Sequence, residues 1–216
     1  MTLADPAVLR VYVVTSSAFA GRDHRDVALA AIRGGATAIQ LRAPELDPDT
    51  VRSLAVELAP VCRRAGVLFV VNDRPEIAAA ADAGGAHVGE GDDPASARAK
   101  LGPGPVLGIS VGSVEQARRA RSLGADYLGV TVWPTPTKPG AIAAGLEAVR
   151  SVAGATELPV VGIGGIDAGN AGAVLGAGAV GVAVISTVAA AADPVDATRR
   201  LVAAVRDAGE VRGAAR

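Results

Sequence analysis

The residue types best suited to chemistry in this chain of 216 residues stand just after short apolar runs. Arg42 and Lys138 are cations that can bind phosphate oxygens, whereas Asp73 and Asp92 are carboxylates. Carboxylates belong in a phosphate-binding pocket when a divalent metal lies between them, because Mg²⁺ prefers one or two carboxylates together with phosphate oxygens and water. The pattern therefore predicts a metal-bridged diphosphate site.

A second phosphate site is indicated by the segments GIGG at 162–165 and VIST at 184–187. Their backbone N–H groups are little obstructed by side chains, and such groups commonly hold phosphate near the last strands of a barrel. The loop TVWPTPTKPG at 131–140 adds hydroxyls and an ammonium directly after an apolar run. Its prolines restrict the backbone and so reduce the entropy that the loop loses on binding.

Eight apolar runs rich in Val and Ile precede these residues, at 10–16, 38–42, 68–72, 86–89, 106–110, 127–132, 159–165 and 181–186. Continuous runs of this size are typical of strands covered on both faces, as in parallel sheets. Helix start signals lie between them, since Asp47, Asp93 and Asp193 each precede a proline and Ser113 stands three residues before Gln116. These are signatures of N-caps, of proline at the first helical position and of a capping box.

Eight strand–helix units in this length predict an α/β fold, a single (β/α)8 TIM barrel over residues 1–208, followed by a loose C-terminal tail at 209–216. An open doubly wound sheet would have fewer strands and a glycine-rich fingerprint after the first one, which VTSSAFAG at 14–21 is not. The active site of a barrel lies at the C-terminal ends of its strands. We therefore expect the polar residues after the apolar runs to share one rim.

The bulk composition favours a small-molecule ligand. A formal net charge of -1 argues against a nucleic-acid or anionic-membrane partner, because those need a concentrated excess of Lys and Arg. The single cysteine, Cys62, excludes a disulfide framework and a cysteine-rich metal site. The N-terminal segment lacks signal-peptide features, and the uncharged stretch 168–192 is mostly Ala and Gly. We expect a cytoplasmic protein in which that stretch forms a buried helix, turn and strand rather than a membrane span.

The chain resembles the thiamine phosphate synthase family in the order of its motifs, which are GGATAIQLR, VNDR, AHVGEGD, GISV, GADYLGV, PTPTK, VVGIGGI and GVAVIS. The resemblance implies a Mg²⁺-dependent transferase that joins 4-amino-5-hydroxymethyl-2-methylpyrimidine diphosphate to 4-methyl-5-(2-phosphoethyl)thiazole, or its carboxylated form, and releases diphosphate. It also implies a dissociative reaction, in which the bond to diphosphate breaks first and the thiazole nitrogen traps a pyrimidine-methyl cation. Such a reaction needs no strong general base.

The same resemblance implies roles for individual residues. Gln40 and His87 would lie at the pyrimidine, and Asp73 and Asp92 would hold the metal. The diphosphate would be bound by Arg42, Asn72, Ser110 and Lys138, of which Arg42, Ser110 and Lys138 are the expected catalytic residues. The thiazole phosphate would be bound by Thr135, Thr137, Gly165, Ile185 and Ser186.

The sequence also departs from the family pattern. Pro44 stands where the family has a diphosphate-binding lysine, and Val111-Gly112 stands where it has Thr-His. Arg22 or Arg25, after the first predicted strand, could supply the lost charge.

Alternatives remain open at this stage. The chain could be a thiazole tautomerase of the same barrel family, or a non-catalytic binder of phosphorylated thiamine precursors. Asp73 could cap a helix beginning at Pro75, and His87 could be structural. We expect His24, within the charged segment GRDHRD, to be solvated, and Tyr127 to be a packing residue. The oligomeric state is not readable from the sequence, which is compatible with a homo-oligomer.

Overall fold

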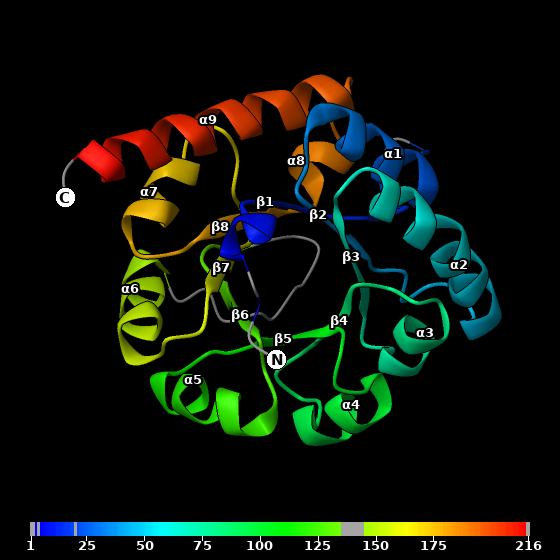
Figure 1. Cartoon of the computed structure of the whole chain (residues 1–216). Helices are drawn as coiled ribbons and strands as arrows, with labels where there is room; N and C mark the ends of the chain where they lie inside the picture. The colour runs from blue at the N-terminus through cyan, green and yellow to red at the C-terminus, as the bar shows by residue number, and fades with distance from the viewer. Residues whose placement is uncertain (1–2, 4, 20, 135–144, 215–216) are drawn as a thin grey trace.

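Eight parallel strands close into a barrel in the computed structural model, which describes residues 3, 5–19, 21–134 and 145–214 (Figure 1). The strands follow one another around the barrel in chain order, and β1 pairs with β8 to close it. They are β1 (Val11–Val14), β2 (Ala38–Leu41), β3 (Leu68–Asn72), β4 (Gly85–Val88), β5 (Val106–Ser110), β6 (Tyr127–Thr131), β7 (Val160–Ile163) and β8 (Gly181–Val184). The predicted (β/α)8 fold and its eight strands are confirmed.

Helices surround this barrel (Figure 1). They are α1 (His24–Gly34), α2 (Pro48–Arg64), α3 (Pro75–Ala80), α4 (Pro94–Leu101), α5 (Val114–Ala120), α6 (Gly145–Ala155), α7 (Ala171–Gly176), α8 (Ser186–Ala189) and α9 (Pro194–Ala214), with 3-10 turns η1 (Pro6–Leu9) and η2 (Arg121–Leu123). The long α9 lies across α1 and α7. It continues to Ala214, past the domain end that we expect at residue 208.

The predicted helix starts are confirmed. Asp47 accepts hydrogen bonds from the backbone of the first turn of α2, and Asp93 and Asp193 do the same for α4 and α9. Ser113 and Gln116 form a full capping box at α5. Each cap satisfies backbone N–H groups that have no partner within the helix, and so fixes where the preceding loop ends.

Each strand is buried on both faces. Along β1, Val11 and Val13 pack against the helices, whereas Tyr12 and Val14 belong to the cluster inside the barrel. This alternation follows from the two-residue period of a strand. Tyr12 is paired in register with two alanines, Ala38 and Ala183, whose small side chains leave room for its phenol ring.

A glycine on the neighbouring strand leaves room for the Tyr127 ring. Gly108 is its register partner, and a Cβ atom there would lie 2.1 Å from Tyr127 Cζ. The register is fixed at the start of both strands by Asp126, whose Oδ2 accepts from Leu107 N at 2.8 Å and from Arg98 Nη2 at 2.6 Å. This contact therefore places the glycine opposite the tyrosine.

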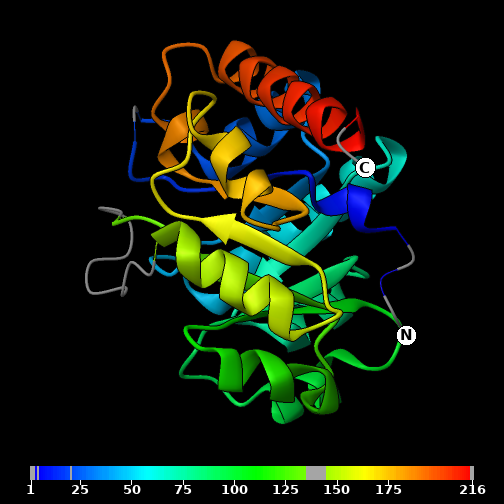
Figure 2. The same ribbon diagram turned by 90° about the vertical axis from the view of Figure 1, so that its left-hand side faces the viewer.

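The strands end on the side of the barrel opposite the N-terminus (Figure 2). The uncharged stretch 168–192 forms α7, β8 and α8, as expected, and in the described part of the chain we find no helix with the length and apolarity to span a membrane. Cys62 is fully buried, and burial raises its pKa to about 11.

Gly181→Ala is expected to destabilise the barrel at its closing seam. A Cβ atom at Gly181 would lie 1.9 Å from the Leu9 carbonyl oxygen, a backbone atom that cannot move without shifting the chain. We expect a loss of about 1–3 kcal/mol or more in the free energy of unfolding, measured by urea denaturation. Gly176→Ala at the end of α7 is the matched control, because no atom lies within 4 Å of its added Cβ. Equal stability of the two variants would contradict this packing.

Candidate active site

A cavity of about 200 Å³ opens at the C-terminal ends of the strands. Every residue of the predicted site that the structure describes lines it, from six different strands or the loops after them. These residues are Gln40, Arg42, Asn72, Asp73, His87, Asp92, Ser110, Gly165, Ile185 and Ser186. Thr135, Thr137 and Lys138 lie outside the described residues.

A chain of hydrogen bonds crosses the floor of this cavity. Gln40 Nε2 donates to Tyr12 Oη at 2.9 Å, and Tyr12 Oη lies 2.9 Å from Tyr127 Oη. Tyr127 Oη lies 3.1 Å from His87 Nδ1, and His87 Nε2 lies 3.0 Å from Ser110 Oγ. The chain thus joins two predicted site residues on opposite sides of the cavity through two buried phenols.

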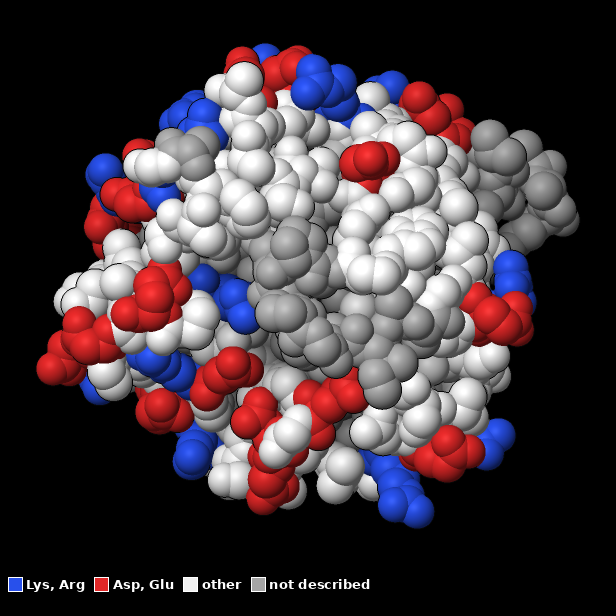
Figure 3. Space-filling model, turned by 180° about the vertical axis from the view of Figure 1, so that it is seen from behind, with Lys and Arg blue, Asp and Glu red and all other residues white. Residues whose placement is uncertain are grey.

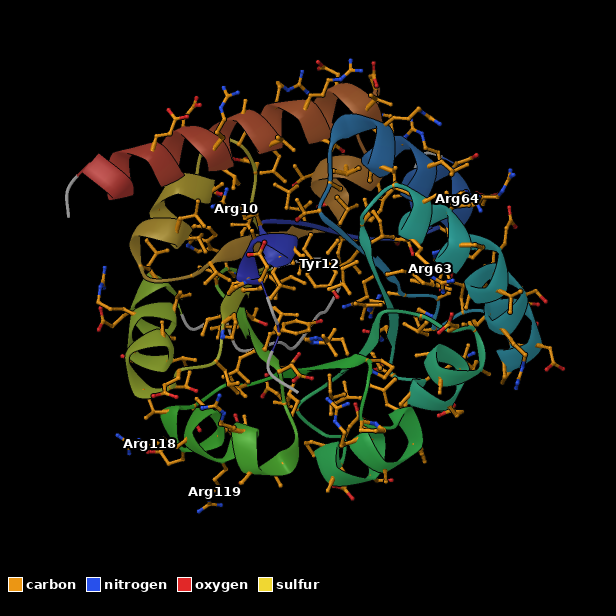
Figure 4. The ribbon with its side chains drawn as sticks, in the orientation of Figure 1. Arg10, Tyr12, Arg63, Arg64, Arg118 and Arg119 are labelled. Atoms are coloured by element: carbon orange, nitrogen blue, oxygen red, sulfur yellow. The ribbon has the colours of Figure 1, made fainter. Side chains whose placement is uncertain are left out.

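Sequence reasoning missed Tyr12 and assigned Tyr127 to packing alone. Both side chains are buried and pack in the barrel interior, and both also belong to the residues that line the cavity. Figure 4 shows Tyr12 lying inside the ring of strands, whereas Arg118 and Arg119 on α5 point outward. The usable signal was the position of Tyr12 as the single polar-tipped residue in the apolar run VYVV.

Burial raises the pKa of both phenols above the ordinary tyrosine value. For Tyr12 this effect outweighs the hydrogen bonds with Tyr127 and Gln40, which lower its pKa. For Tyr127 burial acts together with the nearby Tyr12 and Asp126. Both hydroxyls therefore stay protonated at neutral pH and remain hydrogen-bond donors.

Thr15 bonds the backbone of two site residues, one in β2 and one just after it. Its backbone N–H donates to the Gln40 carbonyl at 2.8 Å, and its hydroxyl accepts from Arg42 N at 3.2 Å. Thr15 is fully buried. The Arg42 guanidinium itself lines the cavity and makes no hydrogen bond or ion pair with another described residue, so it is available to an anion.

The expectation that His24 is solvated is wrong. Its ring is buried, with Nδ1 2.8 Å from Thr15 Oγ1 and Nε2 2.7 Å from Glu45 Oε1. Burial alone would raise the pKa of Glu45, but hydrogen bonds from Ser17, the backbone and His24 outweigh it and lower that pKa. The charged neighbours of His24 concealed its position because, as the first residue of α1, it turns inward onto the end of β1.

Neither arginine considered as a substitute for the missing lysine is free. Arg22 donates from Nη1 to the Ala189 carbonyl at 3.2 Å and from Nη2 to the Ala192 carbonyl at 2.9 Å. Arg25 forms an ion pair with Glu57. These contacts hold both side chains away from the role proposed for them.

Asp73 does not cap α3, because the N-cap of that helix is Arg74 and no described side chain caps it. Asp73 instead has a left-handed backbone, φ 57°, an uncommon conformation for a residue with a side chain. Its N–H donates to the His87 carbonyl at 2.8 Å, and its Oδ2 accepts from Asn72 Nδ2 at 2.5 Å. The unusual backbone keeps the carboxylate at the cavity.

Asp92 is the second carboxylate on this rim. Its Oδ2 accepts from Gly89 N at 2.7 Å, while the neighbouring Asp93 is the cap of α4. Within the described ranges no three His, Cys, Asp or Glu residues form a metal-binding group. Two exposed carboxylates suit a Mg²⁺ ion that takes its other ligands from substrate phosphate and water, rather than a metal held by protein alone.

Two adjacent glycines shape the side of the cavity at the end of β7. Gly164 and Gly165 have φ values of 95° and 62°, which favour glycine. A Cβ at Gly164 would lie 2.7 Å from the Trp133 carbonyl oxygen. The absence of side chains thus lets this turn approach the loop after β6, and its backbone is open to the cavity beside Ile185 and Ser186.

Acidic and basic side chains lie next to one another near the middle of the face on which the strands end (Figure 3). This mixture agrees with the cavity lining, which includes Arg42, Asp73 and Asp92. A cation and two carboxylates at one opening suit a ligand that carries both a phosphate and a bound metal ion.

Comparisons with known proteins agree with this geometry. The thiamine monophosphate synthase family model matches residues 11–188. A thiamine-phosphate synthase from Roseiflexus sp. (strain RS-1) is 47% identical over 95% of this chain and 89% of its own, and one from Moorella thermoacetica is 46% identical over 88% and 91%. The structure of a thiamine phosphate pyrophosphorylase from Pyrococcus furiosus superposes with a TM-score of 0.87 at 36% identity, covering 94% of this chain and 98% of that one.

Tyrosine ionisation should be suppressed in the folded protein. Tyr12 and Tyr127 are the chain's two tyrosines, so the ultraviolet absorbance of tyrosinate reports this pair alone. Phenols in the unfolded chain lose their protons near pH 10, about the usual value, whereas burial retains them in the folded state. Stability is therefore unaffected by this pair at lower pH and falls as the pH rises above about 10. Tyrosinate appearing near pH 10, before the circular dichroism of the fold is lost, would contradict this.

Proposed function

This chain belongs to the thiamine monophosphate synthase family, and from that premise we propose how its cavity acts. The enzyme is a transferase that joins 4-amino-5-hydroxymethyl-2-methylpyrimidine diphosphate to the thiazole phosphate, giving thiamine phosphate and diphosphate. The observation that carries this assignment is one cavity in which the unpaired Arg42 guanidinium, the Asp73 and Asp92 carboxylates and the polar floor lie together. Such a lining suits a substrate with a diphosphate at one end and a heteroaromatic ring at the other.

The proposed division of the cavity follows its floor and its rim. The pyrimidine ring lies on the floor, against Gln40 and His87. The diphosphate lies at the ends of β2, β3 and β5, with ligands Arg42, Asn72 and Ser110, and with Lys138 as a further ligand. The thiazole phosphate lies at the rim of the later strands, with ligands Thr135, Thr137, Gly165, Ile185 and Ser186.

The chemistry is a substitution at the exocyclic carbon of the pyrimidine. The carbon–oxygen bond breaks, its electron pair leaves with the diphosphate, and the thiazole nitrogen donates its lone pair to form the new carbon–nitrogen bond. Negative charge therefore grows on the leaving oxygen. Arg42 and Ser110, together with Lys138, lower the barrier by binding that oxygen group more strongly in the transition state than in the ground state.

The residues of the floor do not need to move a proton in this reaction. Both phenols are held neutral by burial, so neither is a charged nucleophile that could compete with the thiazole for the pyrimidine-methyl cation. The role of the floor is to hold the ring so that its reacting carbon faces the thiazole nitrogen.

Asp73 and Asp92 would hold a Mg²⁺ ion in this proposal. The ion would neutralise charge on the diphosphate. Asn72 and the Gly89 N–H, each bonded to one of these carboxylates, would keep them oriented.

The direct test is a product assay with the pyrimidine diphosphate and the thiazole phosphate, with and without Mg²⁺, following thiamine phosphate by mass. Metal-dependent product is expected. Absence of product from folded protein that still binds the thiazole phosphate would refute the synthase assignment and favour the tautomerase or the non-catalytic binder.

Asp73→Asn should raise the Mg²⁺ concentration needed for half-maximal activity on the order of tenfold or more, because one charged ligand is lost. Asp82→Asn is a matched control. Asp82 also has a left-handed backbone, φ 51°, but its carboxylate forms an exposed pair with Arg63 away from the cavity. An unchanged metal requirement in Asp73→Asn would exclude a metal role for this carboxylate.

A further inference from the structure

We propose that Tyr12 and Tyr127 determine substrate specificity. Their hydrogen bonds connect Ser110 to Gln40 across the cavity floor, and the donor and acceptor at each bond fix which way round the Gln40 amide lies. This inference rests on the proposed function for the identity of the ring on the floor. Neither tyrosine needs to contact the reacting atoms, so both act as positioning residues.

Counting protons from Gln40 onward assigns the donor and the acceptor in each of these hydrogen bonds. Its Nε2 donates to Tyr12 Oη, so that oxygen already accepts one hydrogen bond. The Tyr12 proton then needs an acceptor, and Tyr127 Oη at 2.9 Å is its remaining partner among the described residues. Tyr127 in turn donates to His87 Nδ1. A neutral His87 therefore carries its proton on Nε2 and donates it to Ser110 Oγ.

Reversing donor and acceptor in the hydrogen bonds between His87, Tyr127 and Tyr12 would leave one proton without an acceptor. If His87 Nδ1 donated to Tyr127, then Tyr127 would donate to Tyr12, which also accepts from Gln40. The Tyr12 proton would have no acceptor in the described structure, although the Tyr12 residue is buried. A buried hydroxyl proton without a partner costs about 1–3 kcal/mol.

Each end of the chain thus presents a defined group to the cavity. The Ser110 hydroxyl proton is left to donate, which suits a phosphate oxygen. The Gln40 Oε1 atom is left to accept, and the second proton of Nε2 is left to donate. An aminopyrimidine offers the matching pair, an amino donor beside a ring-nitrogen acceptor.

The two ends are also coupled. Turning the Gln40 amide over would require every hydroxyl and the histidine tautomer to reverse, after which Ser110 could no longer donate to an anion. A diphosphate oxygen at Ser110 therefore holds Gln40 in the orientation that selects the amino group. A 4-oxo analogue, which offers an acceptor beside an N–H donor, would meet the wrong pattern.

Tyr127→Phe breaks this chain in its middle and leaves both end residues in place. Among the described residues the Tyr12 proton then has Gln40 as its remaining partner, so the amide gains by turning Oε1 toward Tyr12 and Nε2 toward the cavity. Selection should move toward the 4-oxo ring. Tyr12→Phe removes the anchor of the amide altogether, and it serves as the second variant if the first does not fold.

The experiment measures competition between the pyrimidine diphosphate and its 4-oxo analogue, as the ratio of kcat/KM values, together with direct binding of each by calorimetry. The wild-type enzyme should prefer the amino substrate by at least about 100-fold. In Tyr127→Phe this preference should fall by about tenfold or more, and in Tyr12→Phe it should also fall. Thr198→Val is the control. Among the described residues its buried hydroxyl bonds the Pro194 carbonyl within α9, so the preference should stay unchanged.

The inference is overturned if the folded tyrosine variants keep the wild-type ratio of kcat/KM values within twofold. A purely structural role of the tyrosines would give that result, because it would lower activity on both substrates alike. If the wild-type protein forms no thiamine phosphate, the proposed function fails separately. The calorimetric preference for the amino ring and its loss in the variants would then still support the orienting role of the tyrosines.

Discussion

The contact on which the site depends is the pair of hydroxyls that Tyr12 and Tyr127 bring together inside the barrel, 2.9 Å apart. Two phenols fit there because their register partners are small, with alanines flanking Tyr12 and Gly108 beside Tyr127. Since a buried hydroxyl must be paired, the two rings fix each other and then fix Gln40 and His87. An apolar interior thereby ends in a polar floor in which both phenol hydroxyls are paired.

A second set of contacts performs the same task at the rim. Thr15 bonds to the backbone of both Gln40 and Arg42, and His24 bonds Thr15 while Glu45 bonds His24. The loops after β1 and β2 are therefore tied together behind the cavity. Floor and rim meet at the end of β2, where Tyr12 bonds the Gln40 side chain and Thr15 bonds the backbone of Gln40 and Arg42.

The sequence predicted what is set locally. The strands, the caps at Asp47 and Asp93, and the clustering of polar residues at one rim follow from apolar periodicity and from the shared direction of parallel strands. The sequence did not predict that His24 is buried or that Tyr12 lies on the cavity floor. The burial of these two residues depends on which residues face them from neighbouring strands and loops. The local segments GRDHRD and VYVV do not show which distant residues those are.

The loop after β2 shows how one departure in sequence changes the electrostatics of the site. The family resemblance implies a lysine where this chain has Pro44, and the side chain of the next residue, Glu45, bonds His24. Arg22 and Arg25 are committed to other partners, so neither restores the charge. In the proposed function, Arg42, Lys138 and the metal would therefore balance the charge of the leaving group without a cation at position 44. Thr15 bonds the backbone of Arg42, whose side chain lines the cavity, and a single guanidinium can bind phosphate oxygens in two places at once.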